Sequence, residues 1–236
     1  MAREQQGIAL AVSTVIFALR PHPETGLSAP WIPLVRRIAD PFDGLWALPG
    51  GWVGQTESLA DAAARNLLET TALEPTYLEQ LYAFGDVDRS PNDRVVSVVY
   101  WALVRAEEAQ QALEGENVRW FAADALPTLA FDHNVIVDYA LWRLRTKVEY
   151  SRIARAFLGE TFTLTELREV HEAVLQRPLD PANFRRQVEG TLVPTEARVE
   201  GGRHRPPRLY RYDHSIELVD NGPLSHEKTG STRVVS

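Results

Sequence analysis

Two long apolar stretches constrain the fold of this chain more than any other feature. Ile8–Leu19 and Arg94–Val104 are rich in Val, Ile, Leu, Ala and aromatic residues and carry almost no charge. The first is 12 residues long, whereas a membrane-spanning helix needs about 20 apolar residues. No cleavage-site pattern follows it. We therefore expect both stretches to be strands buried inside a soluble, cytoplasmic protein.

Shorter segments complete an alternation of strand and helix signals. The further strand signals are Trp31–Ile38 and Val118–Ala122, and the helix signals, with apolar residues spaced by three and four, are Glu57–Thr71 and Asn134–Lys147. Strands outnumber helices, so the pattern predicts an α/β sandwich rather than a doubly wound sheet. Trp101 and Trp142 fall within these patterns, and we expect both in the core.

A change in character near Val148 predicts a second domain. A chain of 236 residues is longer than most single domains, and only helical signals follow this point until a terminal pair of extended segments. We expect an α/β domain over residues 1–148 and a smaller domain over residues 149–213. Residues 214–236 are polar and poorly patterned, which is typical of a flexible tail.

The second domain has the signals of three short helices and a hairpin. Tyr150–Leu158 is the first expected helix. Thr163 and Glu166 form a capping box that opens the second, and Asp180-Pro181 offers a cap and an N1 proline for the third. The two extended segments, Leu192–Val199 and Arg208–Tyr212, flank a basic tip. In this order the elements resemble a winged helix-turn-helix.

The distribution of charge suits DNA contact by this second domain. The chain carries a net charge of −7 and no cysteine, so thiolate metal sites and disulfides are excluded. Residues 1–148 hold 12 Lys/Arg against 19 Asp/Glu, whereas residues 181–212 hold seven Arg against three Glu. Phosphate contact needs only a local positive field. DNA binding is therefore favoured over use of the same fold for protein docking or dimerisation.

The third helix is the expected recognition helix, with Phe184 and Val188 buried on its inner side. Its remaining side chains are of the types that read base edges or clamp phosphates. The expected DNA-binding residues are Thr165 on the second helix, Asn183, Arg185, Arg186 and Gln187 on the third, and Arg203, His204 and Arg205 at the wing tip.

The first domain contains a segment that resembles the Nudix box. That pattern is Gly, five residues, Glu, seven residues, then Arg-Glu-U-x-Glu-Glu-x-Gly-U, where U is a bulky aliphatic residue. The positions that match in register are Gly51, Glu57, Arg65, Leu67, Glu69 and Leu73. Asn66 and Thr70 stand where the pattern has glutamates, and Ala72 where it has glycine. We expect the box to form a loop followed by a helix, with Glu57 and Arg65 holding the loop and the helix together.

The lost glutamates predict a binding domain without metal chemistry. Neutral Asn and Thr do not repay the dehydration of Mg²⁺, so we expect no catalytic residue, no metal site and no required cofactor. Backbone N–H groups, arginines and aromatic faces still suit a nucleotide diphosphate. By type or proximity to the box, the candidate ligand-binding residues are Arg36, Arg37, Trp46, Trp52, Glu69, Arg89 and His133.

Taken together, the chain resembles the Nudix-related transcriptional regulators of NAD metabolism (NrtR-like). Besides the eroded box, the segments that carry this resemblance are residues 80–89, 94–100, 130–133, 147–151, 183–186 and 205–212. The resemblance implies an N-terminal Nudix-type α/β/α sandwich followed by a winged helix-turn-helix. It further implies a homodimer on palindromic operator DNA near genes of NAD synthesis or salvage. ADP-ribose or a related nucleotide formed from NAD would release that DNA.

Two alternatives stay open at this point. One is a Mg²⁺-dependent ADP-sugar pyrophosphatase that uses Glu57, Glu69 and a further carboxylate such as Asp61 or Glu74. The other is a repressor whose effector is unrelated to NAD, with the Nudix fold kept for dimerisation.

Overall fold

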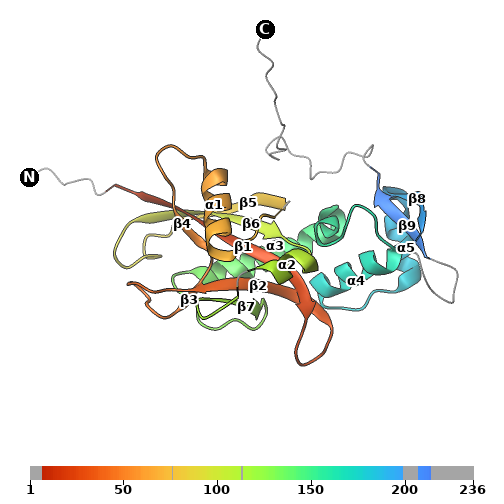
Figure 1. Ribbon diagram of the computed structural model, residues 1–236, viewed down its shortest axis with the longest axis horizontal. Helices are drawn as coiled ribbons and strands as arrows, with labels where there is room; N and C mark the ends of the chain where they lie inside the picture. The colour runs from red at the N-terminus through yellow and green to blue at the C-terminus, as the bar shows by residue number, and fades with distance from the viewer. Residues whose placement is uncertain (1–6, 76, 113, 199–206, 214–236) are drawn as a thin grey trace, which may run out of the picture.

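The computed structural model describes residues 7–75, 77–112, 114–198 and 207–213, and a seven-stranded sheet organises its first part (Figure 1). The strands are β1 (Ala9–Pro21), β2 (Ser28–Arg36), β3 (Trp46–Ala47), β4 (Gly50–Trp52), β5 (Tyr77–Phe84), β6 (Val95–Leu103) and β7 (Val118–Ala122). Their order is β3-β2-β1-β6-β5, with β4 paired to β1 and β7 to β2. β1 and β6 run parallel, and the other pairs are antiparallel.

β1 and β6 are buried on both faces, as their continuous apolar sequences predict. Successive side chains of a strand point to opposite faces. Phe17 and Trp101 therefore enter the core that contains α3 (His133–Tyr150), whereas Ile16 and Ala102 enter the core that contains α1 (Leu59–Thr71) and α2 (Ala106–Gln111). This arrangement confirms an α/β/α sandwich.

The helix of the box begins two residues later than predicted. Ser58 is its N-cap and accepts a hydrogen bond from the backbone N–H of Asp61, so Glu57 lies in the preceding loop. The helix ends at Ala72, which adopts a left-handed conformation with φ 58°. The predicted strands are confirmed, but β3, β4, β5 and α2 were not predicted.

The first helix predicted for the second domain, Tyr150–Leu158, is shorter than predicted and is a 3-10 helix rather than an α-helix. α3 continues without a break to Tyr150, and only a 3-10 helix, η1 (Ile153–Phe157), follows. The cause is Ser151, whose backbone is extended and whose hydroxyl oxygen accepts a hydrogen bond from the N–H of Ile153 at 3.1 Å. The chain therefore turns sharply between α3 and η1.

The remaining elements of the second domain match the prediction. They are α4 (Leu164–Leu175), α5 (Pro181–Val188), β8 (Leu192–Arg198) and β9 (Arg208–Tyr212). The 3-10 turn η2 (Glu189–Thr191) between α5 and β8 was not predicted. Thr163 and Glu166 form the predicted capping box. Asp180 caps α5, with Pro181 at its first position. β8 and β9 pair antiparallel. The predicted wing tip, Arg203 to Arg205, and the tail 214–236 lie outside the described residues.

The two parts share one continuous core. Leu144 of α3, Phe157 of η1, Leu167 of α4 and Phe184 of α5 all belong to the apolar cluster that contains Phe17 of β1. Figure 1 shows α4 beside the end of the sheet, where the two parts meet. A movement of one part therefore disturbs side chains of the other.

The two tryptophans predicted for the core differ. Trp101 is fully buried, but Trp142 is 55% exposed on the outer side of α3, so the prediction for Trp142 was wrong. Across the described part of the chain, no helix combines the length and apolar character needed to cross a membrane.

Candidate ligand site and DNA interface

Glu57 ties the loop of the box to its helix. Its carboxylate accepts hydrogen bonds from Arg65 Nε at 3.0 Å, from Arg65 Nη2 at 2.7 Å and from the N–H of Gly54 at 2.6 Å. The hydrogen bonds from Arg65 and then from Gly54 lower the pKa of Glu57 to about 2. These bonds support the structural role predicted for Glu57 and Arg65.

Asn66 and Thr70 direct their side chains toward their own helix. Asn66 is buried and its Nδ2 donates to the carbonyl of Ala62 at 2.8 Å. The Thr70 hydroxyl donates to the carbonyl of Asn66 at 2.6 Å. A carboxylate in an active Nudix box would instead point to the cations. These two positions therefore serve the helix backbone.

The carboxylates near the box are engaged by neighbouring groups of the protein. Glu57 is held by Arg65, and Glu69 is exposed and paired with Arg65 at 3.3 Å. Asp61 accepts a hydrogen bond from the Ser58 hydroxyl at 2.7 Å. Within the described ranges, no group of three His, Cys, Asp or Glu residues has the geometry to hold a metal ion.

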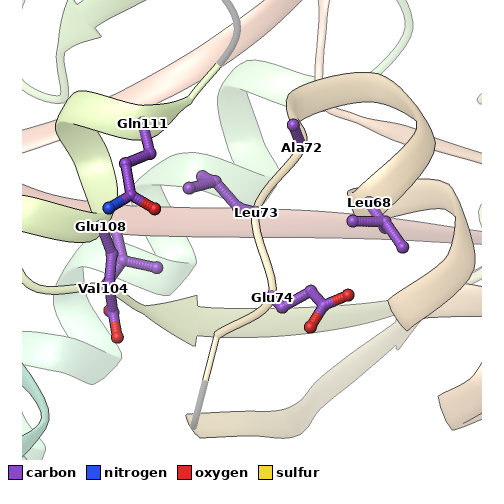
Figure 2. A pocket seen from close by; sticks show the side chains of 7 residues that line it. All are labelled: Leu68, Ala72, Leu73, Glu74, Val104, Glu108 and Gln111. Carbon is purple, nitrogen blue, oxygen red and sulfur yellow. The ribbon is translucent and has the colours of Figure 1, made fainter.

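Glu74 lies apart from these carboxylates, in a recess beyond the end of α1. Figure 2 shows the side chains that line this recess of about 270 Å³: Leu68, Ala72, Leu73, Glu74, Val104, Glu108 and Gln111. No cationic side chain is among them, and two are acidic. Such a lining repels the two phosphates of an ADP-ribose-like ligand. The recess is therefore a poor nucleotide site.

The segment from Trp46 to Trp52 crosses the sheet where β1 and β2 separate. Trp46 pairs with Arg36 of β2, and Trp52 pairs with Ala11 of β1. Between them, the N–H of Thr14 donates to the carbonyl of Pro49 at 2.8 Å. Trp52 is 59% exposed. Two of the predicted ligand-binding residues, Trp46 and Trp52, therefore lie on this crossing segment, and a third, Arg36, lies beside it.

Cationic and aromatic side chains cluster at the Trp46 end of the crossing. The Trp46 ring meets Phe121 edge to face at 5.1 Å and lies under the guanidinium of Arg119 at 5.6 Å. Arg36 is exposed and its Nε donates to the carbonyl of Gly44 at 3.3 Å. Arg119 and Phe121 were not predicted, because β7 had no connection with the box in the sequence.

Arg37 follows Arg36 in the chain and contacts an aromatic pair of its own. Its Nε donates to the carbonyl of Pro41 at 2.7 Å, and its guanidinium lies 4.8 Å from the Phe131 ring centroid. Phe131 in turn meets Phe42 edge to face at 4.9 Å. Both phenylalanines have positive φ, 56° and 67°. Such conformations cost energy for bulky residues and are concentrated at functional sites.

Arg89 and His133 are held by protein contacts beneath this cluster. Arg89 makes two hydrogen bonds to Asp132, at 3.0 and 2.7 Å. His133 Nδ1 accepts the N–H of Leu48 at 3.0 Å, which requires a neutral ring. Burial lowers the pKa of His133 to about 4. The charge of Asp132 raises this pKa by a smaller amount, and the charge of Arg89 lowers it further. Both residues position the loops that carry Leu48 and Phe131.

The outer face of α5 has the composition of a DNA-reading surface. Phe184 and Val188 are buried, and Asn183, Arg185, Arg186 and Gln187 are exposed, as predicted. Arg186 donates to the Asn183 amide oxygen, so the two side chains lie together. Thr165 is exposed on α4.

Arg208 of β9 extends this cationic surface to the base of the wing. It lines a recess together with Arg185, Glu189 and Leu164. The wing is fixed to the segment just before α4 by a bridge between Phe162 and Tyr210, whose backbone groups exchange hydrogen bonds of 2.9 and 2.8 Å. Arg208 was not predicted, because the DNA-contacting residues of the wing were expected at its tip. The alternation of side chains along a strand does not show which face of the wing Arg208 lies on.

Comparison with known proteins agrees with this two-part organisation. Residues 11–140 match the NUDIX domain family, and residues 154–212 match the NrtR DNA-binding winged helix domain. The chain is 35% identical over 206 residues to an ADPR responsive transcriptional repressor of Acinetobacter baylyi, covering 82% of each protein. It is also 35% identical over 111 residues to an ADP-ribose pyrophosphatase of Methanocaldococcus jannaschii, covering 47% of this chain and 66% of that protein.

Two solved structures of Shewanella oneidensis NrtR resemble the chain. One is a complex with a 27mer DNA, with 35% identity, a TM-score of 0.71 and coverage of 86% of this chain and 93% of that one. The other is the NUDIX domain complexed with ADP ribose, with 34% identity, a TM-score of 0.50 and coverage of 61% and 93%.

The fold and its two sites define a class of protein in which a Nudix domain is joined to a DNA-binding winged helix. Within that class, this chain belongs to the NrtR family.

Proposed function

We propose that this chain is an ADP-ribose-responsive repressor that binds palindromic operator DNA as a homodimer and controls genes of NAD synthesis or salvage. One observation carries the proposal: a helix that exposes two arginines, an asparagine and a glutamine shares a core with a Nudix domain. The relatives with these two parts include an ADPR-responsive repressor and a protein crystallised with DNA and with ADP ribose.

The Nudix domain acts in this proposal as a sensor rather than an enzyme. Asn66 and Thr70 bond to the helix backbone, and Glu57 is engaged by Arg65. This leaves Glu69 without the neighbouring carboxylates that a pair of cations needs. Bound ADP-ribose therefore stays intact and acts as an equilibrium effector.

The ligand lies across the crossing segment. Arg36, Arg37 and Trp46 offer two cations and an aromatic face at one end, and Trp52 and Glu69 lie at the box end. Guanidinium groups suit phosphates, and an indole face suits a base. Arg89 and His133 complete the site indirectly, because their bonds to Asp132 and Leu48 fix the surrounding loops.

Two connections carry the ligand signal to the DNA-binding part. The first is α3, whose buried Lys147 donates to Glu79 of β5 at 2.6 Å and whose Glu149 pairs with Arg177 at 2.9 Å. The second is the contact of α4 with β2, where Gln176 donates to the carbonyl of Ser28 at 3.2 Å. β2 also carries Arg36 of the ligand site. A shift of β2 on ligand binding therefore reaches α4 directly, and small changes of helix placement weaken operator binding strongly.

Calorimetry combined with product analysis tests the sensor directly. ADP-ribose is titrated into the protein with and without Mg²⁺, and the mixture is then analysed for AMP and ribose 5-phosphate. Saturable binding with ADP-ribose intact supports the proposal. Steady Mg²⁺-dependent hydrolysis that Glu69→Gln abolishes would instead assign the activity of the pyrophosphatase relative.

A further inference from the structure

A recess of about 150 Å³ lies where α4, α5 and the two strands of the wing come together (Figure 1). Arg185 and Glu189 line it from the end of α5, and Arg208 and Tyr210 line it from β9. The rest of its lining is apolar. One water molecule occupies roughly 30 Å³ in the liquid, so the recess is large enough to admit a group of the size of a phosphate.

The two arginines reach this recess from different parts of the chain. Arg185 is one of the exposed residues of α5 that are expected to contact DNA, and Arg208 is an exposed residue of β9. A guanidinium group presents several N–H donors in a fixed plane, which suits the oxygens of a phosphate. Two such groups beside one recess are therefore suited to hold one phosphate of the DNA backbone.

Glu189 already lies against one of these arginines. Its Oε1 is 3.6 Å from Nη2 of Arg185, which lies one helical turn earlier. This distance is longer than a good hydrogen bond, and the side chains of Arg185 and Glu189 are 60% and 65% exposed, so the pair contributes little to stability. A carboxylate therefore engages Arg185 loosely, in the recess that a phosphate would enter.

The stability of α5 does not account for a glutamate at this position. Glu189 is the C-cap of α5, and a negative charge at the C-terminal end of a helix opposes the helix dipole. An arginine four residues before a glutamate is also the less favourable order for such a pair. A neutral residue would therefore suit the helix at least as well, which points to a role for the charge of Glu189 outside the fold.

We propose that Glu189 competes with DNA for Arg185 and thereby lowers the affinity of the protein for DNA of any sequence. The proposed function, on which this inference rests, brings α5 and the wing against the duplex. In the free protein the carboxylate of Glu189 pairs with Arg185, and in the complex a backbone phosphate takes its place between Arg185 and Arg208. Phosphate contacts carry no direct sequence information, so Glu189 acts equally on operator and on other DNA.

Fluorescence anisotropy with the full chain tests this competition on two labelled duplexes: an operator from upstream of NAD-synthesis or salvage genes, and a scrambled duplex of the same composition. Each titration is repeated over a series of salt concentrations. Glu189→Gln removes the competing charge and keeps the shape of the side chain. We expect it to lower the dissociation constant for both duplexes by roughly threefold to tenfold, and to steepen the slope of log affinity against log salt concentration by about one for each recess that contacts DNA.

Three further variants locate the effect in the recess. Arg208→Gln is expected to weaken binding to both duplexes and to make the same slope shallower by about one per recess. Arg211 is also exposed on β9, but successive side chains of a strand alternate between its faces, so Arg211→Gln is expected to leave the slope unchanged. Glu114→Gln is the matched control for the glutamate, because Glu114 pairs with Arg20 at 2.9 Å in the Nudix part, and it is expected to leave both dissociation constants unchanged.

A Glu189→Gln variant that binds both duplexes no more tightly than the wild type would overturn the inference. A gain confined to the operator would also overturn it, because Glu189 would then act on sequence reading rather than on a phosphate. Equal slopes for Arg208→Gln and Arg211→Gln would place the phosphate outside the recess. A wild type that does not prefer the operator contradicts the proposed function itself, whereas the scrambled duplex still shows whether Glu189 competes with DNA.

Discussion

Asn66 fills the space above its helix where a side chain at residue 51 would lie. A Cβ added to Gly51 would come within 2.2 Å of Asn66 Oδ1, and Asn66 Nδ2 is fixed by its bond to Ala62. The loop and the helix of the box are thus fitted to each other through one glycine and one amide.

Gly51→Ala is expected to destabilise the protein by about 1–3 kcal/mol, because the buried amide has little room to move. Chemical denaturation measures the change. Asn66→Ala, which removes the clashing amide, provides the control. The double variant is expected to lose less than the sum of the single losses. Strict additivity would show that the two residues are not in contact.

Restoring the glutamates of the box is expected to create a cation site. Asn66→Glu together with Thr70→Glu places three carboxylates on one side of α1 with Glu69. The double variant is expected to be less stable than the wild type without Mg²⁺ and to regain about 1.4 kcal/mol at ten times the Mg²⁺ dissociation constant. Thermal melts with and without Mg²⁺ measure this. A wild type that is stabilised equally by Mg²⁺ would refute the account of the eroded box.

Ala72→Gly is expected to stabilise the protein by about 1 kcal/mol, because Ala72 has φ 58° and glycine adopts this conformation without strain. The melting temperature would rise by about 2–4 °C. Ala64→Gly, at an exposed position inside α1, is the matched control and is expected to lose about 1 kcal/mol. Equal effects at the two positions would contradict the left-handed helix end.

Two buried histidines are expected to make the protein acid-sensitive. Burial lowers the pKa of His133 and of His171 from 6.5 to about 4. Unfolding therefore takes up protons between these pH values, and stability falls as pH decreases from 6.5 to 4, by up to about 1.4 kcal/mol per pH unit for each histidine. Denaturation at several pH values measures the slope. His133→Gln, which keeps an acceptor for Leu48, is expected to reduce it by about one proton, and an unchanged slope would argue against a buried neutral His133.

Arg186→Ala is expected to weaken operator binding by about 1–3 kcal/mol while leaving ADP-ribose affinity unchanged. The exposed Arg155 of η1 provides a control of equal charge away from α5. Fluorescence anisotropy on labelled DNA and calorimetry with ADP-ribose give the two affinities. A parallel loss of both affinities would show that the ligand and DNA functions are not divided between the two parts.

Local rules predicted the regular parts of the molecule. The continuous apolar runs of β1 and β6, the capping box at Thr163 and the Asp180-Pro181 start of α5 depend on neighbouring residues, which the sequence displays directly. β3 and β4 were not predicted, because strands of two and three residues are too short to show a repeating pattern of apolar residues. They exist because the crossing segment finds partners in β2 and β1.

The candidate site was predictable only in part, because it too depends on contacts between segments that are far apart in the sequence. Asn66 and Thr70 stood out because a known pattern fixed what belongs there. The pair of Arg89 and Asp132 joins residues 43 positions apart, and the stacking of Arg119 on Trp46 depends on the placement of β7. Trp142 was misplaced because helical spacing marks an apolar stripe without telling whether it is buried in the core or exposed at the surface.

The central claim is that DNA binding and nucleotide binding are coupled in one chain. A mobility-shift experiment at fixed salt, with DNA from upstream of NAD-synthesis or salvage genes, tests it most directly. The account predicts a specific complex that ADP-ribose dissociates in a concentration-dependent way. A specific complex that persists at saturating ADP-ribose would contradict the coupling, and failure to form any specific complex would contradict the assignment as a repressor.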